Sequence, residues 1–459
     1  VLSYTKAIEV DETNAHTWFY LGRSHMSLGE DDAAVAAFDR AIALSKDFGE
    51  AHYYKGIALF RTRKMPESAA ALDEATRLMP DFADAFREHG RALSALGRYI
   101  DAAAAFGTVL EMVPGDLVAM YGQARACDHL GRYHEAIAAY AQVNRIQSDC
   151  ERAFLYRGFA QMLTRQFEDA TESFSRTIGL NPENAEAWQE KAKALIELEM
   201  FGQAIEAYDG FLAIRPDTVT VLFDKGLALE QLDRTGEALE VFNRCIALGL
   251  DTARVHAEAG FCLFRLERYD EAVTSLDRSI EREPKSDRVL IYKGDALLLI
   301  KRYEDAIGAF DAALAIDAGL ERAHRGRGIA LTRTGRFEDA IVALDRALEG
   351  DPAAPDVLAC KGYSLYRLGR NKEAVEALGR ALKKQSKNKQ VLLWRSKALY
   401  RLGRYAEAEA SFARFHALDP DIAQAWYFHA MSLVFMERHY DSPAPPHRSL
   451  ALHDTCPRP

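Results

Sequence analysis

Small and bulky apolar residues recur along this chain at one fixed interval, which is the separation between Gly22 and Gly56. A first column holds small residues, most of them glycine: Gly22, Gly56, Gly90, Ala124, Gly158, Ala192, Gly226, Gly260, Gly294, Gly328, Gly362, Ser396 and Ala430. A second column, from Ala34 to Ala408, is alanine at every position except Ser68. A third column, from Phe38 to Phe412, is bulky and apolar. A period of this length is the sequence signature of a repeat protein.

Each repeating unit contains two apolar stripes with helical spacing. In residues 287–320 the first stripe is Leu290, Gly294, Leu297 and Leu298, and the second is Ala306, Phe310, Ala313 and Leu314. Short turns such as "LGRY" at residues 96–99 separate the stripes, and glycine there suits a left-handed helix end. The pattern predicts an all-α chain of helix–turn–helix hairpins. The hairpins must stack, because one hairpin cannot bury its own apolar faces.

The pattern resembles the tetratricopeptide repeat (TPR) family, whose unit is a 34-residue helix–turn–helix. The first-helix aromatic of that family is matched by Trp18, Phe86, Phe154, Trp188 and Trp426, and its turn aromatic by Tyr99, Tyr133, Tyr269, Tyr303 and Tyr405. The closing proline is matched by Pro80, Pro114, Pro182, Pro216, Pro284, Pro352 and Pro420. The resemblance covers about residues 1–437. It implies an α–α superhelix (a TPR solenoid) whose first helices line the concave face.

The fixed register predicts how the chain is divided. Residues 15–422 are expected to form twelve complete repeats, with one boundary in every period. Residues 1–14 match the second helix of a truncated repeat, and residues 423–437 match the first helix of a thirteenth. The period stops at residue 438, and the proline-rich residues 438–459 are expected to be a disordered or non-native tail.

Composition narrows the classes of protein that this chain could belong to. The formal net charge of −10 argues against nucleic-acid binding, which usually needs a basic excess. No apolar run is long enough to predict a membrane-spanning helix. The six cysteines have no metal-binding spacing, so we expect free thiols in a reducing compartment, with no metal or other cofactor. These features predict a cytoplasmic protein.

The repeated residues serve packing, and we find no nucleophile–base pair among them. His52, His256 and His324 stand in the column of the first-helix aromatic, and we expect them to pack rather than to bind a ligand. The sequence therefore predicts a non-catalytic scaffold that binds peptide or helical segments of partner proteins in the concave groove. The alternative is a regulatory or substrate-recruiting arm of a larger enzyme whose catalytic domain lies outside this chain.

Partner contacts are expected at first-helix positions rich in aromatic residues and arginine, the types enriched in interface hot spots. The candidates are Phe19, Arg23, Tyr53, Arg87, Arg91, Tyr121, Arg125, Phe223, Phe261, Arg265, Arg333, Tyr366, Arg367, Lys397, Tyr400 and Arg401. The other interpretation is that many of these rings are half-buried against the neighbouring first helix.

Charge distinguishes the C-terminal end of the groove. Residues 355–422 contain 14 lysines and arginines against 7 acidic residues, and Arg333, Arg367 and Arg401 share one column. We expect an acidic peptide to bind there, the alternative being a solvated basic rim. The half-repeats at the two ends also predict head-to-tail self-association of the chain, unless they are simply the ends of a fragment.

Overall fold

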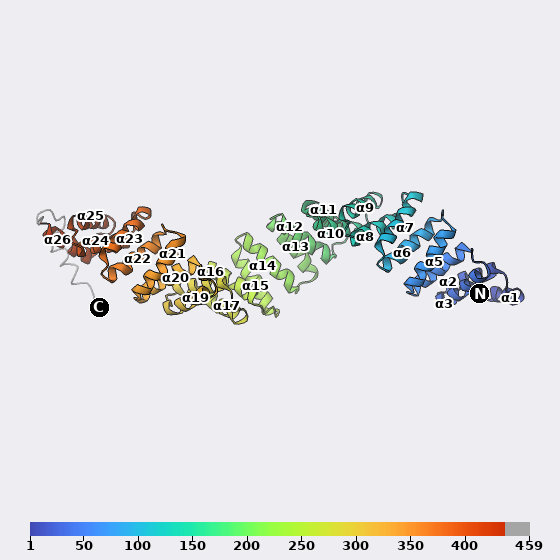
Figure 1. Cartoon of the computed structure of the whole chain (residues 1–459), viewed down its shortest axis with the longest axis horizontal. Helices are drawn as coiled ribbons and strands as arrows, with labels where there is room; N and C mark the ends of the chain where they lie inside the picture. The colour runs from blue at the N-terminus through green and yellow to red at the C-terminus, as the bar shows by residue number, and fades with distance from the viewer. Residues whose placement is uncertain (437–459) are drawn as a thin grey trace. The chain divides into compact units, whose positions relative to one another are not determined.

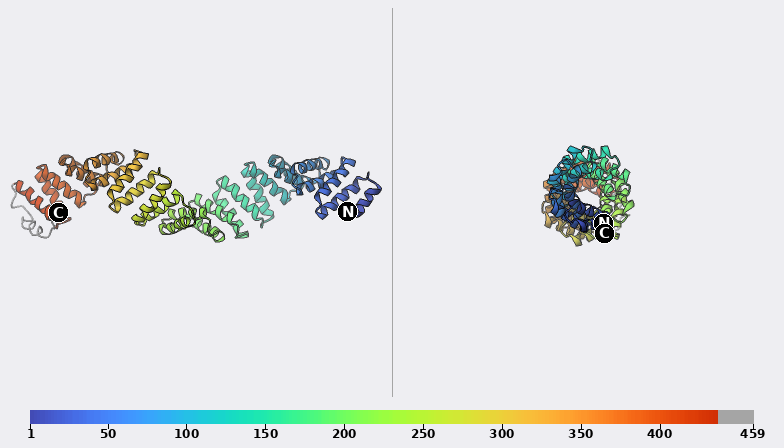
Figure 2. Two further views of the ribbon diagram at one scale, coloured as in Figure 1. Left: turned by 90° about the horizontal axis from the view of Figure 1, so that it is seen from below. Right: turned by 90° about the vertical axis from the view of Figure 1, so that its right-hand side faces the viewer.

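The computed structural model describes residues 1–436, which form 26 α-helices and no β-strand (Figure 1). The predicted tail at residues 438–459 lies outside the described residues. The chain divides into two compact units, of which the second begins at Asp233. Within each unit, consecutive helices stack as neighbouring hairpins (Figure 2). The predicted all-α repeat architecture is confirmed.

The first unit contains helices α1 to α14. Their bounds are α1 (Leu2–Val10), α2 (Ala15–Leu28), α3 (Asp31–Leu44), α4 (Gly49–Arg61), α5 (Met65–Leu78), α6 (Ala83–Ala95), α7 (Tyr99–Met112), α8 (Leu117–His129), α9 (Tyr133–Ile146), α10 (Glu151–Leu163), α11 (Phe167–Leu180), α12 (Ala185–Glu197), α13 (Phe201–Ile214) and α14 (Val219–Gln231). Even-numbered helices are first helices of a repeat, and odd-numbered helices are second helices.

The second unit contains the remaining described helices. Their bounds are α15 (Thr235–Ala247), α16 (Ala253–Arg265), α17 (Tyr269–Arg282), α18 (Asp287–Leu299), α19 (Tyr303–Ile316), α20 (Glu321–Thr334), α21 (Phe337–Gly350), α22 (Pro355–Arg367), α23 (Asn371–Lys384), α24 (Lys389–Arg401), α25 (Tyr405–His416) and α26 (Ala423–Phe435). From Ala15 onward, successive first helices begin one period apart in the sequence, and from Asp31 the second helices do the same.

Short-range polar contacts fix where many helices begin. The side chain of Asn184 caps α12 by accepting a hydrogen bond from the Ala187 amide at 3.0 Å. Second helices often follow an arginine that pairs with an acidic residue of the first turn, as Arg370 does with Glu373 at 2.6 Å. Both devices suit a helix N-terminus, which has unpaired amides and a positive dipole end.

The turn between the two helices of a repeat needs a residue in the left-handed conformation. Glycine provides it in several repeats, for example Gly97 at φ 74° and Gly403 at φ 72°. Six other turns place a residue with a side chain there, among them Lys301 at φ 65°. A left-handed conformation costs such a residue about 1–2 kcal/mol relative to a right-handed one.

The recurring columns meet in the core of each repeat. The small residue of the first helix faces the bulky residue of the second helix in the same repeat, as Gly22 faces the ring of Phe38. The alanines of the second column, including Ala34 and Ala306, are fully buried beside them. Since glycine and alanine occupy so little volume, the two helices of a hairpin pack closely and the ring fills the remaining space.

A recurring ion pair links several second helices to the first helix of the next repeat. Lys55 pairs with Asp39 at 2.6 Å, and Lys293 pairs with Asp277 at 2.6 Å. Arg327 pairs in the same register with Asp311 at 2.5 Å. The two partners have the same separation in sequence in every one of these pairs. Because the pairs lie near the surface, each contributes less than about 1 kcal/mol, but their spacing favours one register between repeats.

The aromatic near the start of the first helix is anchored to the preceding turn. Trp188 Nε1 donates to the main-chain oxygen of Pro182 at 2.9 Å. The predicted packing histidines use the same place: His324 Nε2 lies 2.9 Å from the oxygen of Ala318, and His52 Nε2 lies 3.1 Å from that of Lys46. An imidazole in this column therefore replaces an indole in both its packing and its hydrogen bond.

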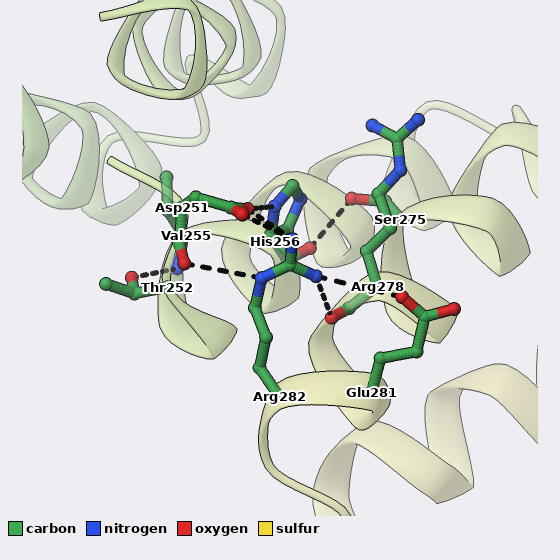
Figure 3. Close-up of polar contacts among 8 residues, drawn as sticks. All are labelled: Asp251, Thr252, Val255, His256, Ser275, Arg278, Glu281 and Arg282. Carbon is green, nitrogen blue, oxygen red and sulfur yellow. Dashed lines mark hydrogen bonds and ion pairs between the residues drawn. The ribbon is translucent and has the colours of Figure 1, made fainter. Parts of the chain in front are cut away.

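His256 is also anchored to the preceding turn, but its partner there is a side chain (Figure 3). It is buried, and its Nε2 lies 2.7 Å from Oδ1 of Asp251, which Arg282 also contacts at 2.5 Å. These two contacts hold the pKa of the Asp251 carboxyl below its usual value, Arg282 contributing most. Ser275 donates to the main-chain oxygen of His256 at 2.8 Å rather than to its ring. The contacts thus tie the start of α16 to α17.

Within residues 1–436, no helix is long and apolar enough to cross a membrane. No disulfide joins the five cysteines of this part. No three histidine, cysteine or acidic side chains in the described part of the chain come close enough to hold a metal ion.

Candidate functional site

First helices of neighbouring repeats contact one another as well as their own second helices. In the second unit α20 contacts both α18 and α22, and α22 contacts α24; in the first unit α6 contacts both α4 and α8. The face on which first helices approach one another is the inner face of each stack. We call the side chains that the first helices contribute to this face the inner surface. All of the candidate residues predicted from the sequence belong to first helices.

Several candidate rings are packed between helices. Phe19, Phe223, Phe261 and Tyr366 are buried. Tyr53, Tyr121 and Tyr400 are half-buried. Burial, assisted by the nearby Asp84, raises the pKa of Tyr53 to about 12, so its hydroxyl stays protonated at neutral pH. The structure therefore gives these rings a packing role, and their contact with a partner stays a prediction.

Candidate arginines of the first unit lie over aromatic rings. The guanidinium carbon of Arg23 is 4.8 Å from the ring centroid of Tyr54, and that of Arg91 is 5.2 Å from Phe60. Arg125 lies 5.0 Å from the ring centroid of Tyr156. Such stacking limits the rotamers of a long side chain and leaves its charge in place.

Acidic neighbours partly neutralise two of the arginines in this unit. Arg91 pairs with Glu88 at 2.9 Å. Arg87 pairs with Asp84 at 2.7 Å and with Asp116 at 2.6 Å, so it bridges α6 and the start of α8. Because Arg87 is held by two carboxylates, its first role is structural.

The basic end of the second unit is different. Arg265 pairs with Asp233, but Arg333, Arg367 and Arg401 have no carboxylate within ion-pair distance among residues 1–436. Lys397 also lacks such a partner in that part of the chain; burial, followed by the repulsion of Arg401, lowers its pKa. The inner surface of α20, α22 and α24 therefore carries uncompensated positive charge.

Aromatic side chains hold Arg367 and Arg401 in position. The guanidinium of Arg367 is 4.7 Å from the Phe337 ring centroid and donates to the Tyr363 hydroxyl at 2.7 Å. Arg401 lies 4.3 Å from the ring centroid of Tyr366. Arg367 and Arg401 are thus ordered before any ligand arrives, which lowers the entropy cost of binding.

A pocket of about 310 Å³ opens between α20, α22 and α24, and we call it the basic pocket. Arg333 and Arg367 line it together with Phe337, Tyr363 and Trp394. The rings of Tyr363 and Trp394 pack with centroids 4.4 Å apart. The arrangement can bind a carboxylate through two guanidinium groups while apolar atoms contact the rest of the ligand.

Sequence reasoning missed Tyr363 and Trp394 in this pocket. Tyr363 stands in the same column as the candidates Arg23, Phe261 and Lys397 but was not itself predicted. Trp394 stands in the same column as Tyr20 and Tyr54, which supplied no candidate. That column contains aromatic residues, acidic residues and two glycines. This variation could have indicated that the position does not serve packing alone.

Comparison with known proteins agrees with the repeat pattern. Tetratricopeptide repeat profiles match residues 3–47, 19–81, 87–149, 190–249, 263–321 and 361–430, and a second profile with the same description matches residues 297–361. Together these matches cover most of the chain. The chain belongs to the tetratricopeptide repeat family. Its TPR fold supports protein or peptide partners and a role as an interaction scaffold.

Solved structures resemble this TPR chain in part. YrrB, described as a TPR protein with an unusual peptide-binding site, is 23% identical over 40% of this chain and 95% of its own, with a TM-score of 0.39. A structure of Naa15/Naa10 bound to HypK-THB is 15% identical over 88% of this chain and 70% of its own, with a TM-score of 0.44. The structure of the APC/C hetero-tetramer Cut9–Hcn1 is 13% identical over 99% of this chain and 97% of its own, with a TM-score of 0.37. No curated protein matches the chain.

Proposed function

We propose that this TPR chain binds partner proteins on its inner surface and that the basic pocket takes an acidic segment of the partner. The observation that carries the proposal is the set of unpaired cations on α20, α22 and α24. Elsewhere many arginines are paired with a nearby acid, as Arg336 is with Asp339 at 2.8 Å. Cations that are both ordered and uncompensated favour an anionic ligand.

The shape of the surface supports an extended or helical peptide rather than a small metabolite. The pocket is one feature of a row of first helices, so a peptide can make contacts along several repeats at once. Arg401 continues the arginine column one repeat beyond the basic pocket. A segment with acidic residues spaced along its length can therefore meet more than one guanidinium.

A fluorescein-labelled octaglutamate peptide tests the charge preference with the full chain. The double variant Arg333→Glu/Arg367→Glu is expected to weaken its binding, measured by fluorescence anisotropy, at least tenfold. Lys372→Glu/Lys383→Glu is the matched control, because it makes the same charge change at exposed positions on the second helix α23. The control is expected to change affinity less than threefold, and octalysine should not bind.

Cross-linking mass spectrometry of a complex isolated with its natural partner tests the surface itself. Cross-links are expected on α20, α22 and α24. Equal octaglutamate affinity in both double variants would remove the acidic-segment proposal. Cross-links concentrated on the second helices would remove the inner surface as the binding face.

A further inference from the structure

One column of the first helices in the first unit holds tyrosine in several repeats and glycine in one. Tyr54 stacks on Phe38 of the preceding repeat, with ring centroids 6.3 Å apart and planes 21° apart. Tyr156 stacks on Tyr140 in almost the same way, at 6.2 Å and 20°. Gly122 stands in this column between them, beside Phe106, and contributes no side chain.

A pocket of about 370 Å³ lies beside Gly122, and we call it the Gly122 socket. Its lining includes Phe60, Tyr99, Phe106, Tyr121 and Gly122. A β-carbon at Gly122 would lie 2.5 Å from Cζ of Phe106, so the tip of that ring leans against the glycine backbone. The volume falls within the range of about 300–1,000 Å³ that is typical of small-ligand pockets.

The walls of the socket are flat and partly aromatic. Tyr99 and His129 stack with centroids 4.4 Å apart and planes 14° apart. The guanidinium of Arg91 covers Phe60 on another side. A planar side chain can therefore enter between ring faces and guanidinium planes, where stacking and cation–π contacts both favour it.

The charged side chains at the edge of the socket determine which group of a ligand can bind next to an aromatic ring. Arg91 is paired with Glu88, whereas Arg125 has no carboxylate within ion-pair distance in the described part of the chain. Arg125 instead donates to Nε2 of His129 at 3.2 Å, a contact that a carboxylate could replace or join. The rim thus offers one available guanidinium next to an apolar, ring-lined hollow.

We propose that the Gly122 socket binds an aromatic side chain of a partner peptide, with a neighbouring carboxylate of the peptide meeting Arg125. The partner's ring enters the hollow beside Gly122, the only member of this column in the first unit that has no side chain. The inference rests on the proposed function, since it names a chemical feature of the partner, but it concerns the first unit and residues that the basic pocket does not use.

A small probe isolates this site from the rest of the inner surface. 3-Phenylpropionate is titrated into the full chain, and the ¹³C-methyl signals of Ala95 and Ala126, which both line the socket, are followed by NMR. Saturable shifts of both signals are expected. Propionate, which lacks the ring, should bind at least tenfold more weakly, and Arg125→Gln should weaken 3-phenylpropionate about tenfold.

Two variants fill the socket in different ways. Gly122→Tyr places a ring at the position that Tyr156 fills in the next repeat, but its β-carbon would press on the buried Phe106 ring. Val118→Trp fills the same space from an exposed position on α8, so it should not disturb the core. This variant keeps the test valid if Gly122→Tyr does not fold. Both are expected to abolish the shifts. Glu190→Tyr is the matched control, because it adds a ring to the same column two repeats away and should leave binding unchanged.

The result is separable from the test of the basic pocket. Absence of shifts in the unmodified chain, equal shifts with propionate, or unchanged shifts in a folded socket-filled variant would overturn the socket proposal. None of these outcomes alters the octaglutamate measurement. Conversely, failure of octaglutamate to bind leaves the 3-phenylpropionate result standing.

Discussion

Gly294 lies directly against the ring of Phe310. A β-carbon on Gly294 would come within 2.6 Å of Cε1 of that ring. Phe310 is fully buried, so the ring cannot move into solvent to make room. The same relationship joins Gly22 to Phe38, which makes this contact a repeated determinant of how closely the two helices of a hairpin approach.

Gly294→Ala should therefore destabilise the chain despite the better helix propensity of alanine. Overpacking of a filled core typically costs about 1–3 kcal/mol. Gly308→Ala in the paired helix α19 is the control, since no atom lies within 4 Å of the place that its β-carbon would take; it should stabilise the chain by about 0.5–1 kcal/mol. Urea denaturation of the two variants should give shifts of opposite sign. Stabilisation by both changes would show that the close approach is not required.

Lys301→Gly is expected to stabilise the second unit by about 0.5–1 kcal/mol. It removes the strain of a left-handed lysine, and the greater flexibility of glycine in the unfolded chain offsets part of the gain. The reverse substitution, Gly97→Lys, places a lysine at φ 74° in the first unit and should destabilise by a similar amount. Thermal denaturation followed by circular dichroism measures both. A lower melting temperature for Lys301→Gly would contradict the strain argument.

Stability at the C-terminal end of the described helices should fall in mild acid. His416 is buried, stacks on Trp426 with centroids 3.6 Å apart, and has no hydrogen-bond partner for either ring nitrogen among residues 1–436. Burial, and then the neighbouring His429, lowers its pKa from 6.5 to about 4, while Asp419 opposes the shift. Above pH 6.5 both folded and unfolded chains hold a neutral ring. Between pH 6.5 and 4 only the unfolded chain gains the proton.

The difference between the pKa of His416 in the folded and unfolded chains should lower the stability of α25 and α26 by about 3 kcal/mol at pH 4. Little further loss is expected below pH 4. Amide hydrogen exchange at α25 and α26, corrected for the intrinsic rate at each pH, measures the change. His416→Leu places there the residue type found at Leu382, one repeat earlier in the same column, and should remove most of the pH dependence. A smaller pH dependence should remain in this variant, because the pKa of His429 is also lowered. An unchanged profile in the variant would assign the effect to another group.

Cys360 should react slowly with iodoacetamide at pH 8. Its thiol lies at the wall of the basic pocket, and burial raises its pKa to about 11 although Arg333 opposes the shift. The thiolate is the nucleophile, so its population is small until the pH approaches 11. Peptide mapping after timed alkylation measures the rate, with the urea-unfolded chain as reference. Alkylation of Cys360 in the native chain as fast as in the unfolded chain would contradict the raised pKa.

The periodic residues were sufficient to predict the architecture. The Gly294 and Phe310 columns pair in space as their spacing requires, and His52 and His324 pack in the aromatic column as expected. The candidate site was harder to predict, because aromatic residues on a first helix serve both packing and binding. Phe19 and Phe261 are buried by neighbouring first helices, a result that depends on side-chain rotamers and on the neighbouring repeat. The Gly122 socket lies beside a residue without a side chain, which gives no apolar signal in the sequence.

The fixed spacing of the inter-repeat ion pairs has a consequence for how such a chain can change length. Excision of residues 287–320 would bring α17 against α20, and Arg327 would then occupy the place of Lys293 opposite Asp277. The new junction would carry the same pair of opposite charges, and Gly328 would take the place of Gly294. Loss or duplication of a one-repeat block in the gene can thus shorten or lengthen the array while the ion pair across the new junction is kept.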